Sequence, residues 1–250
     1  MKLAYVPLLQ IQRDLYKLPR GFERFQEYLR TMIDSGSGDL KFPLPALNPM
    51  GKDHVPLFLD HLLEINADGC GQDAVSAAEV FLQSDPGDYQ VCLVVSDDLQ
   101  GGWTNRYTSE FGYRFRQGAY HKRGWIAALL WTSETYSTEL IHQEVLACIF
   151  RAAYIQQHHE AQTLGEMLRQ EGTIMVQSGA TTPALDPEDL EYTREVLTPY
   201  FDRSDQPTLV AALFGDTAAR QLGYQPIGLS PRAGLALALA ERRAEVKSVY

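Results

Sequence analysis

The residues best suited to chemistry are two adjacent carboxylates, Asp97 and Asp98, which come just after the apolar, β-branched run 91–95. Clustered carboxylates repel one another, so they persist where they bind a hard cation through oxygen, share a proton or meet a cationic group. In an open parallel sheet, ligands bind in the crevice beyond the carboxyl ends of the strands. The pair is therefore expected to be catalytic and to bind a divalent cation. The alternative is that each acid only caps a following helix.

Two further acids stand just beyond other strand-like runs. Glu134 follows the run 127–131, and Asp216 follows the run 208–214. If these strands are parallel and adjacent, both acids are expected to converge with the aspartate pair on one rim. Mg²⁺ or another divalent cation is then the expected ligand of all four acids. The alternative for Asp216 is a helix N-cap, a position that aspartate favours.

The segment after the aspartate pair carries groups that suit ligand binding. Trp103 offers a stacking face, Asn105 offers a donor and an acceptor, and Arg106 offers a guanidinium fork for phosphate or carboxylate. Paired glycines at 101 and 102 let the backbone approach a ligand. We expect this loop to fold over an anionic or aromatic ligand. The alternative is internal, with Arg106 in a salt bridge to the aspartates and Trp103 in the core.

One histidine and one more arginine are candidates for the same site. His142 lies one turn into the helix that follows Glu134, so it is expected to face the rim as a general base. Arg232 lies in the segment 228–234, where a Ser-Pro pair opens a helix, and free amides at a helix start bind phosphate or carboxylate. The alternatives are an ordinary surface or core histidine and a simple helix cap.

The other histidines and the cysteines suggest no site. His54 and His61 share a helix face but are separated by about 10 Å along the axis, too far for one zinc ion. The segment 48–54 is read as a turn and a helix start. The three cysteines are scattered without CxxC spacing, so neither a disulfide framework nor a thiolate zinc site is predicted.

The elements that must position these groups alternate along the chain. Runs typical of strands occur at 3–9, 89–95, 124–131, 173–176 and 208–214. Apolar residues recur at helical spacing over 21–33, 53–65, 73–82, 137–158, 188–200, 216–222 and 231–244, with a glycine-containing break at 68–71. This order predicts an α/β fold, a mostly parallel sheet with helices on both faces in a Rossmann-like three-layer arrangement. Without repeats or a convincing linker, residues 1–250 are expected to form a single α/β domain.

The aromatic and basic segment 103–116 fits two structures. Tyr107, Phe111 and Phe115 are spaced as on one face of a helix, but Phe111, Tyr113 and Phe115 also alternate as in a strand. Arginines between aromatic residues can stack on bases and hold phosphates. The formal net charge of −10 argues against nucleic acid as a partner.

The composition is that of an acidic globular protein, with 45% hydrophobic and 22% charged residues and a pI of about 5.1. No apolar run approaches the ~18 residues of a transmembrane helix, and the start of the chain lacks a signal-peptide pattern. With scattered, unpaired cysteines, these features predict a soluble, cytoplasmic protein without a membrane partner.

Two functions fit these residues. The first is a divalent-metal-assisted hydrolase or transferase acting on a phosphorylated or carboxylated small molecule, with the arginines holding the anion and His142 as base. The second is a non-catalytic ligand-binding or homo-oligomeric assembly protein, in which the aromatic and basic segment 103–125 and the apolar C-terminal helix 233–240 form a ligand pocket or a dimer face. The sequence alone does not decide between an enzyme and a binding protein.

Overall fold

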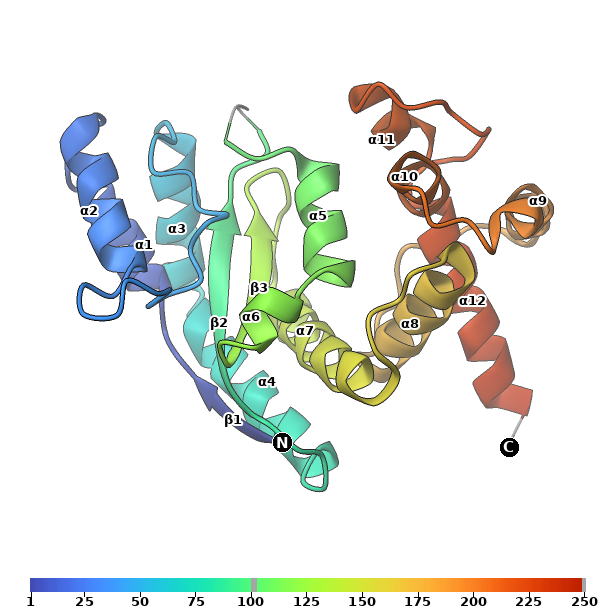
Figure 1. Cartoon of the computed structure of the whole chain (residues 1–250), viewed down its shortest axis with the longest axis horizontal. Helices are drawn as coiled ribbons and strands as arrows, with labels where there is room; N and C mark the ends of the chain where they lie inside the picture. Colours follow the sequence, from blue (N-terminus) through green and yellow to red (C-terminus); the bar gives the residue numbers. More distant parts are fainter. Residues whose placement is uncertain (100–102, 249–250) are drawn as a thin grey trace. The chain divides into compact units, whose positions relative to one another are not determined.

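The chain contains both helices and strands, and three strands form one parallel sheet. In the computed structural model, which describes residues 1–99 and 103–248, the strand order is β1 (Lys2–Tyr5), β2 (Asp88–Ser96) and β3 (Trp125–Trp131) (Figure 1). The predicted mixture of helices with a parallel sheet is confirmed at this level. The paired glycines 101 and 102 lie outside the described residues.

The central strand β2 and its neighbour β3 form the core of the sheet. Every residue of β3 is buried, as are the last six of β2, as expected for parallel strands covered on both faces. Val91 pairs with Ile126, and Ser96 pairs with Trp131 at the carboxyl end. The residues that follow these two strands therefore emerge side by side at one edge of the sheet.

The contacts divide the chain into two compact units, and the sheet belongs to the first, Met1–Ser109 with Gln117–Ala152. Its helices are α1 (Leu9–Leu15), α2 (Phe22–Met32), α3 (His54–Glu64), α4 (Ala67–Phe81), α6 (Gly118–His121) and the initial parts of α5 (Arg106–Phe115) and α7 (Thr138–His158). Helices α1 and α4 pack against the strands, α3 packs against α1 and α4, and α6 packs against β3. The single-domain expectation stays a prediction.

The second unit, Glu110–Arg116 with Ala153–Tyr250, contains helices joined by loops and no strand among its described residues. It contains α8 (Leu164–Gln177), α9 (Pro187–Leu197), the 3-10 turn η1 (Thr198–Tyr200), α10 (Gln206–Phe214), α11 (Asp216–Gln221) and α12 (Ala233–Ser248). Helix α12 packs against α8, α9 and α10, which bury its residues 233–239. The apolar face considered for a dimer is thus already covered within the unit.

The strands predicted at 173–176 and 208–214 are wrong, because both segments are helical. A short apolar run does not distinguish a buried strand from a buried helix. The signals that decide lie just upstream. Thr163 begins α8 with a capping box, and the Asp205 carboxylate accepts the Thr208 amide at 3.3 Å to cap α10. The strand interpretation of 103–116 is also wrong, since α5 occupies Arg106–Phe115.

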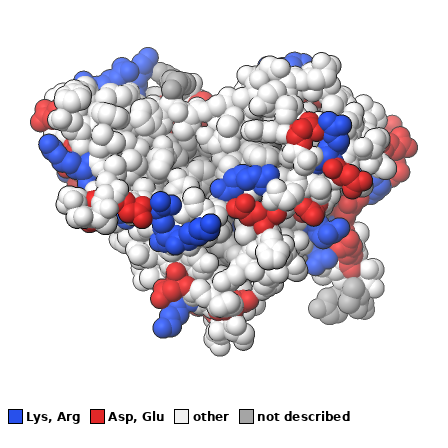
Figure 2. Space-filling model, viewed as in Figure 1, with Lys and Arg blue, Asp and Glu red and all other residues white. Residues whose placement is uncertain are grey.

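Within the described residues, no helix combines the length and the hydropathy needed to span a bilayer. On the face drawn in Figure 2, Lys and Arg side chains lie beside Asp and Glu rather than in large blocks of one sign. This mixing agrees with the many arginine–carboxylate pairs of the chain, among them Arg13–Asp60 and Arg123–Asp39.

A partly buried histidine makes stability depend on pH. His121 packs edge-on against Tyr89, and burial together with the Arg151 charge lowers its pKa to about 4, from an ordinary value of 6.5. As the pH falls, the unfolded chain takes up the proton first, so the stabilisation is complete above about pH 6.5 and is lost as the pH falls towards about 4.

We expect His121→Gln to flatten this dependence. Between pH 7 and pH 4.5 the variant should lose less unfolding free energy than wild type, by on the order of 2 kcal/mol. Urea unfolding at both pH values measures the difference. His61→Gln, at an exposed position, is the control and should follow wild type. Equal pH dependence in His121→Gln and wild type would contradict the prediction.

Candidate functional site

The carboxyl edge of the sheet brings together residues from four parts of the first unit. Asp97 follows β2 and Thr132 follows β3, and the Thr132 amide donates to the Ser96 carbonyl at 3.1 Å, continuing the ladder. Asp97 is only 2% exposed although it is charged. Buried carboxylates need several donors to stay ionised, so the surroundings of Asp97 define the site.

Asp97 accepts hydrogen bonds on both of its carboxylate oxygens. Oδ1 lies 2.8 Å from His54 Nε2, 3.1 Å from Thr132 Oγ1 and 3.3 Å from the Leu99 amide. Oδ2 accepts from Asn48 Nδ2 at 3.0 Å. His54 is the first residue of α3, so the start of that helix carries the imidazole to the end of the central strand. The result is an aspartate–histidine pair.

Buried interactions behind the pair fix the loop that leads to His54. Asn48 accepts the Met50 amide on its side chain at 3.0 Å, and its carbonyl accepts from the Tyr16 hydroxyl. A Cβ at Gly51 would lie 2.6 Å from a methyl of the following helix, so only glycine fits there. Arg24, 7% exposed, lies 5.0 Å over the Tyr16 ring and reaches the Gly51 carbonyl at 3.5 Å. The loop is therefore held rigidly before any ligand binds.

The electrostatics of the pair favour an ionised carboxylate. Burial opposes ionisation of Asp97, but the hydrogen bonds from His54, Asn48 and Thr132 together with the His54 charge outweigh it, so the Asp97 pKa is below its ordinary value. An ionised carboxylate only accepts, so the proton in this contact belongs to His54 Nε2. The other imidazole nitrogen, Nδ1, is buried and has no hydrogen-bond partner in the part of the chain that the structure describes.

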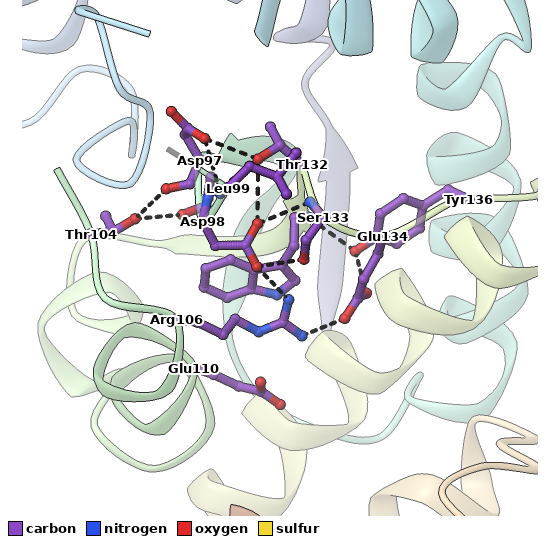
Figure 3. Close-up of polar contacts among 12 residues, drawn as sticks. Asp97, Asp98, Leu99, Thr104, Arg106, Glu110, Thr132, Ser133, Glu134 and Tyr136 are labelled. Carbon is purple, nitrogen blue, oxygen red and sulfur yellow. Dashed lines mark hydrogen bonds and ion pairs between the residues drawn. The ribbon is translucent and has the colours of Figure 1, made fainter. Parts of the chain in front are cut away.

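Asp98 points the other way and has a second set of partners, linked to Asp97 through the Thr132 hydroxyl, which contacts both carboxylates (Figure 3). It accepts from Arg106 at 3.0 Å, and from the Ser133 amide and hydroxyl at 2.9 and 2.6 Å. Arg106 also donates to Glu134 and lies 4.2 Å over the Trp131 ring. The internal salt bridge, which was the alternative interpretation for Arg106, is therefore present. The Arg106 guanidinium pairs with two carboxylates, those of Asp98 and Glu134.

Trp103 takes part in an aromatic cluster. Its ring meets Phe25 and Tyr28 edge-on, with centroids 6.4 and 6.0 Å apart, and its indole nitrogen donates to the Pro45 carbonyl at 3.1 Å. The side chain stays partly accessible, since the residue is 37% exposed. This packing holds the loop after β2 against the segment before α3.

Asn105 and His142 stand apart from the aspartate pair. The Asn105 side chain accepts the Thr108 amide at 3.1 Å and so caps α5. His142 lies in α7, and among the described residues no polar contact joins it to Asp97 or Asp98. Neither residue is brought to the Asp97 carboxylate.

Asp216 and Arg232 belong to the second unit, where both form hydrogen bonds with other residues of the protein. Asp216 follows the helix α10, so the strand-based reason for placing it on the rim is wrong. One of its oxygens accepts the amides of 227–229 at 3.0–3.1 Å. Burial opposes ionisation of Asp216, but these hydrogen bonds outweigh it and its pKa is lowered. Arg232 forms two parallel bonds of 2.8 Å to Glu110, an internal carboxylate in place of a bound anion.

The residues at the carboxyl edge do not fit a divalent cation. All four oxygens of Asp97 and Asp98 already accept hydrogen bonds, and the Arg106 guanidinium stands where a cation would have to approach Asp98 and Glu134. Among the described residues, no three His, Cys, Asp or Glu side chains are grouped as a metal centre. The donors here are N–H and O–H groups, which bind oxygen atoms rather than metals.

His54 is the residue that sequence reasoning missed. Its contact with Asp97 joins positions 43 apart in the sequence, and the segment 48–54 predicts only a turn and a helix start. Comparisons with protein-family models, with curated proteins and with solved structures found no match, so any assignment of function depends on the geometry of this edge.

Proposed function

We propose that the chain is an enzyme, a hydrolase or transferase, in which His54 is the general base and Asp97 orients it. One observation carries the proposal. His54 Nε2 lies 2.8 Å from a buried carboxylate at the end of the central strand, and His54 Nδ1 has no partner among the described residues. A buried nitrogen lone pair without a hydrogen bond lowers the stability of the protein by about 1–3 kcal/mol. Such an unsatisfied atom is expected where the group has a function.

The proposed chemistry follows from the tautomer. With the proton on Nε2 held by Asp97, the lone pair of Nδ1 takes a proton from water or from a substrate hydroxyl once the side chains that bury Nδ1 move aside. The ionised Asp97 then stabilises the imidazolium by direct contact without being protonated itself. The deprotonated oxygen attacks an acyl or phosphoryl centre, and the imidazolium returns the proton to the leaving group. Asn48 and Thr132 keep Asp97 ionised and in place throughout.

A Rossmann-like three-layer arrangement is part of the same proposal. The parallel order of β1, β2 and β3, with α1 and α4 packed on the strands and α6 on β3, supports it. In such sheets the ligand binds beyond the carboxyl ends of the strands. That is the edge at which Asp97 and His54 meet.

The substrate expected from the sequence, a phosphorylated or carboxylated small molecule, keeps weaker support. The Arg106 charge is shared by Asp98 and Glu134, so an anion would have to compete with these carboxylates. A polar substrate with a hydroxyl, or an ester or amide opened by water, needs only the His54 base. The proposal therefore differs from metal-assisted catalysis and includes no metal step.

A substrate screen with matched histidine variants tests the proposal. Wild-type protein is assayed against panels of p-nitrophenyl esters, anilides and phosphate monoesters. For any substrate that is turned over, His54→Gln is expected to lower kcat by about 10²–10⁴-fold, the usual contribution of a general base. His61→Gln changes an exposed histidine of the same helix and should leave kcat unchanged. Turnover that survives His54→Gln would refute the role of this base.

A further inference from the structure

A groove in the second unit is separate from the aspartate–histidine pair. It is an open groove of about 330 Å³ between α12, α9 and the segment that leads into α9. Helices α9 and α12 pack together (Figure 1). This volume is at the lower end of the range for small-molecule sites. Its walls are Pro183, Ala184, Leu185, Leu190, Ala236, Leu239, Ala240, Arg243, Ala244 and Lys247.

The floor of the groove is made of small side chains. Ala236, Ala240 and Ala244 recur every four residues, so they line one face of α12. Together they extend over about 12 Å along the helix axis. Leu185 and Leu190 form the opposite wall. A row of small side chains along one helix face suits a linear alkyl chain better than a compact ring.

Two cations, Arg243 and Lys247, lie one turn apart on the same groove. Arg243 donates to the Ala180 carbonyl, which fixes its guanidinium at the rim. Neither cation has a carboxylate partner among the described residues, whereas the adjacent Arg242 pairs with Glu245 at 2.7 Å. In a chain of net charge −10, this leaves positive charge at the end of an apolar groove.

We propose that this groove binds a single-chain amphipathic anion of the alkyl carboxylate class. The alkyl chain lies along the alanine floor, where its burial is favourable. The carboxylate meets Arg243 and Lys247, whose charges complement it. This ligand matches both the apolar length of the groove and the sign of its charged end.

Calorimetric titration with octanoate, 1-octanol and acetate tests the proposal. We expect saturable binding of octanoate at a stoichiometry of one, at least tenfold weaker binding of 1-octanol and none of acetate. Ala240→Leu fills the floor and should weaken octanoate at least tenfold. The double variant Arg243→Gln/Lys247→Gln should lower the affinity for octanoate to that for 1-octanol. Arg242→Gln changes a residue outside the groove and should leave the affinity for octanoate unchanged.

Several results would overturn the assignment. Wild-type protein that binds no octanoate at millimolar concentration, or binding that Ala240→Leu and the double variant leave unchanged, would rule out this ligand. Sedimentation that shows a dimer disrupted by Ala240→Leu but not by octanoate would assign the groove to a second copy of the chain. Far-ultraviolet circular dichroism checks folding, and Ala244→Leu, one turn further along, replaces Ala240→Leu if that variant does not fold.

Discussion

Replacing Asp97 by asparagine is expected to lower kcat at the proposed site by about 10³–10⁴-fold, an effect within the range expected for loss of the His54 base itself. The amide has the size of the carboxylate, but it carries no charge and one of its atoms is a donor. His54 Nε2–H then loses its charged acceptor, so the tautomer with the lone pair on Nδ1 is no longer favoured by a carboxylate. A substrate found in the screen with wild-type protein gives the measurement.

The same variant is expected to lower the unfolding free energy by about 3 kcal/mol at pH 7, because buried donors lose a charged acceptor. The folded Asp97 pKa is below its ordinary value of 3.8, so the unfolded chain takes up the proton first as the pH falls. The stabilisation is therefore complete above about pH 4 and is lost as the pH falls through the folded pKa. Urea unfolding of both proteins should show that the difference in unfolding free energy between wild type and Asp97→Asn becomes smaller as the pH falls.

Asp53→Asn is the matched control for both measurements. It removes an exposed carboxylate next to His54 and leaves the buried one in place. We expect wild-type kcat and a change in unfolding free energy below about 0.5 kcal/mol. If Asp53→Asn and Asp97→Asn lowered kcat and the unfolding free energy equally, the effects would come from the change in net charge and not from the contact between Asp97 and His54.

The largest effect on stability is expected from Glu110→Ala in the second unit. Glu110 is 5% exposed, accepts two bonds of 2.8 Å from Arg232 and accepts Arg114 Nε at 2.9 Å. Arg114 in turn pairs with the fully buried Glu171. Removing one partner of a buried ion pair leaves uncompensated charge, which destabilises by about 3–5 kcal/mol. Urea unfolding measures the loss.

Glu245→Ala provides the comparison, because it breaks an exposed pair with Arg242 in the same unit. Such pairs contribute at most about 1 kcal/mol. A double-mutant cycle of Glu110→Ala with Arg232→Ala separates the pair from the rest of the cluster. If Glu110→Ala costs no more than Glu245→Ala, the cluster contributes little to stability.

The sheet was predictable where the sequence carries a long, β-branched apolar run. The runs that became β2 and β3 are buried on both faces, so their composition is close to unambiguous. The run 208–214 is equally apolar but forms α10, and its decisive signal is the Asp-Gln-Pro start at 205–207. The predicted break at 68–71 lies inside α4 for a tertiary reason. A Cβ at Gly71 would lie 2.4 Å from the Tyr5 ring, so glycine permits close packing of helix on strand.

The site was predictable in part. The carboxyl ends of β2 and β3 do carry Asp97, Asp98 and Glu134 to one edge, as a parallel sheet requires. The contact of Arg106 with Asp98 was one of two interpretations that the sequence allowed. The contact of His54 with Asp97 was not predictable, because His54 reaches Asp97 through a loop whose course depends on tertiary contacts. The expectation of a metal was based on the number of acidic residues near the strand ends. It did not include the N–H and O–H donors that surround these carboxylates.

The imidazole of His54 offers the most direct test of the central claim. Long-range ¹H–¹⁵N spectra of ¹⁵N-labelled protein distinguish the two nitrogens, and His54→Gln identifies its signals among the six histidines. We predict that the neutral ring carries its proton on Nε2 and has a bare Nδ1, with a changed tautomer in Asp97→Asn but not in Asp53→Asn. A proton on Nδ1, or a spectrum that Asp97→Asn leaves unchanged, would contradict a base oriented by Asp97.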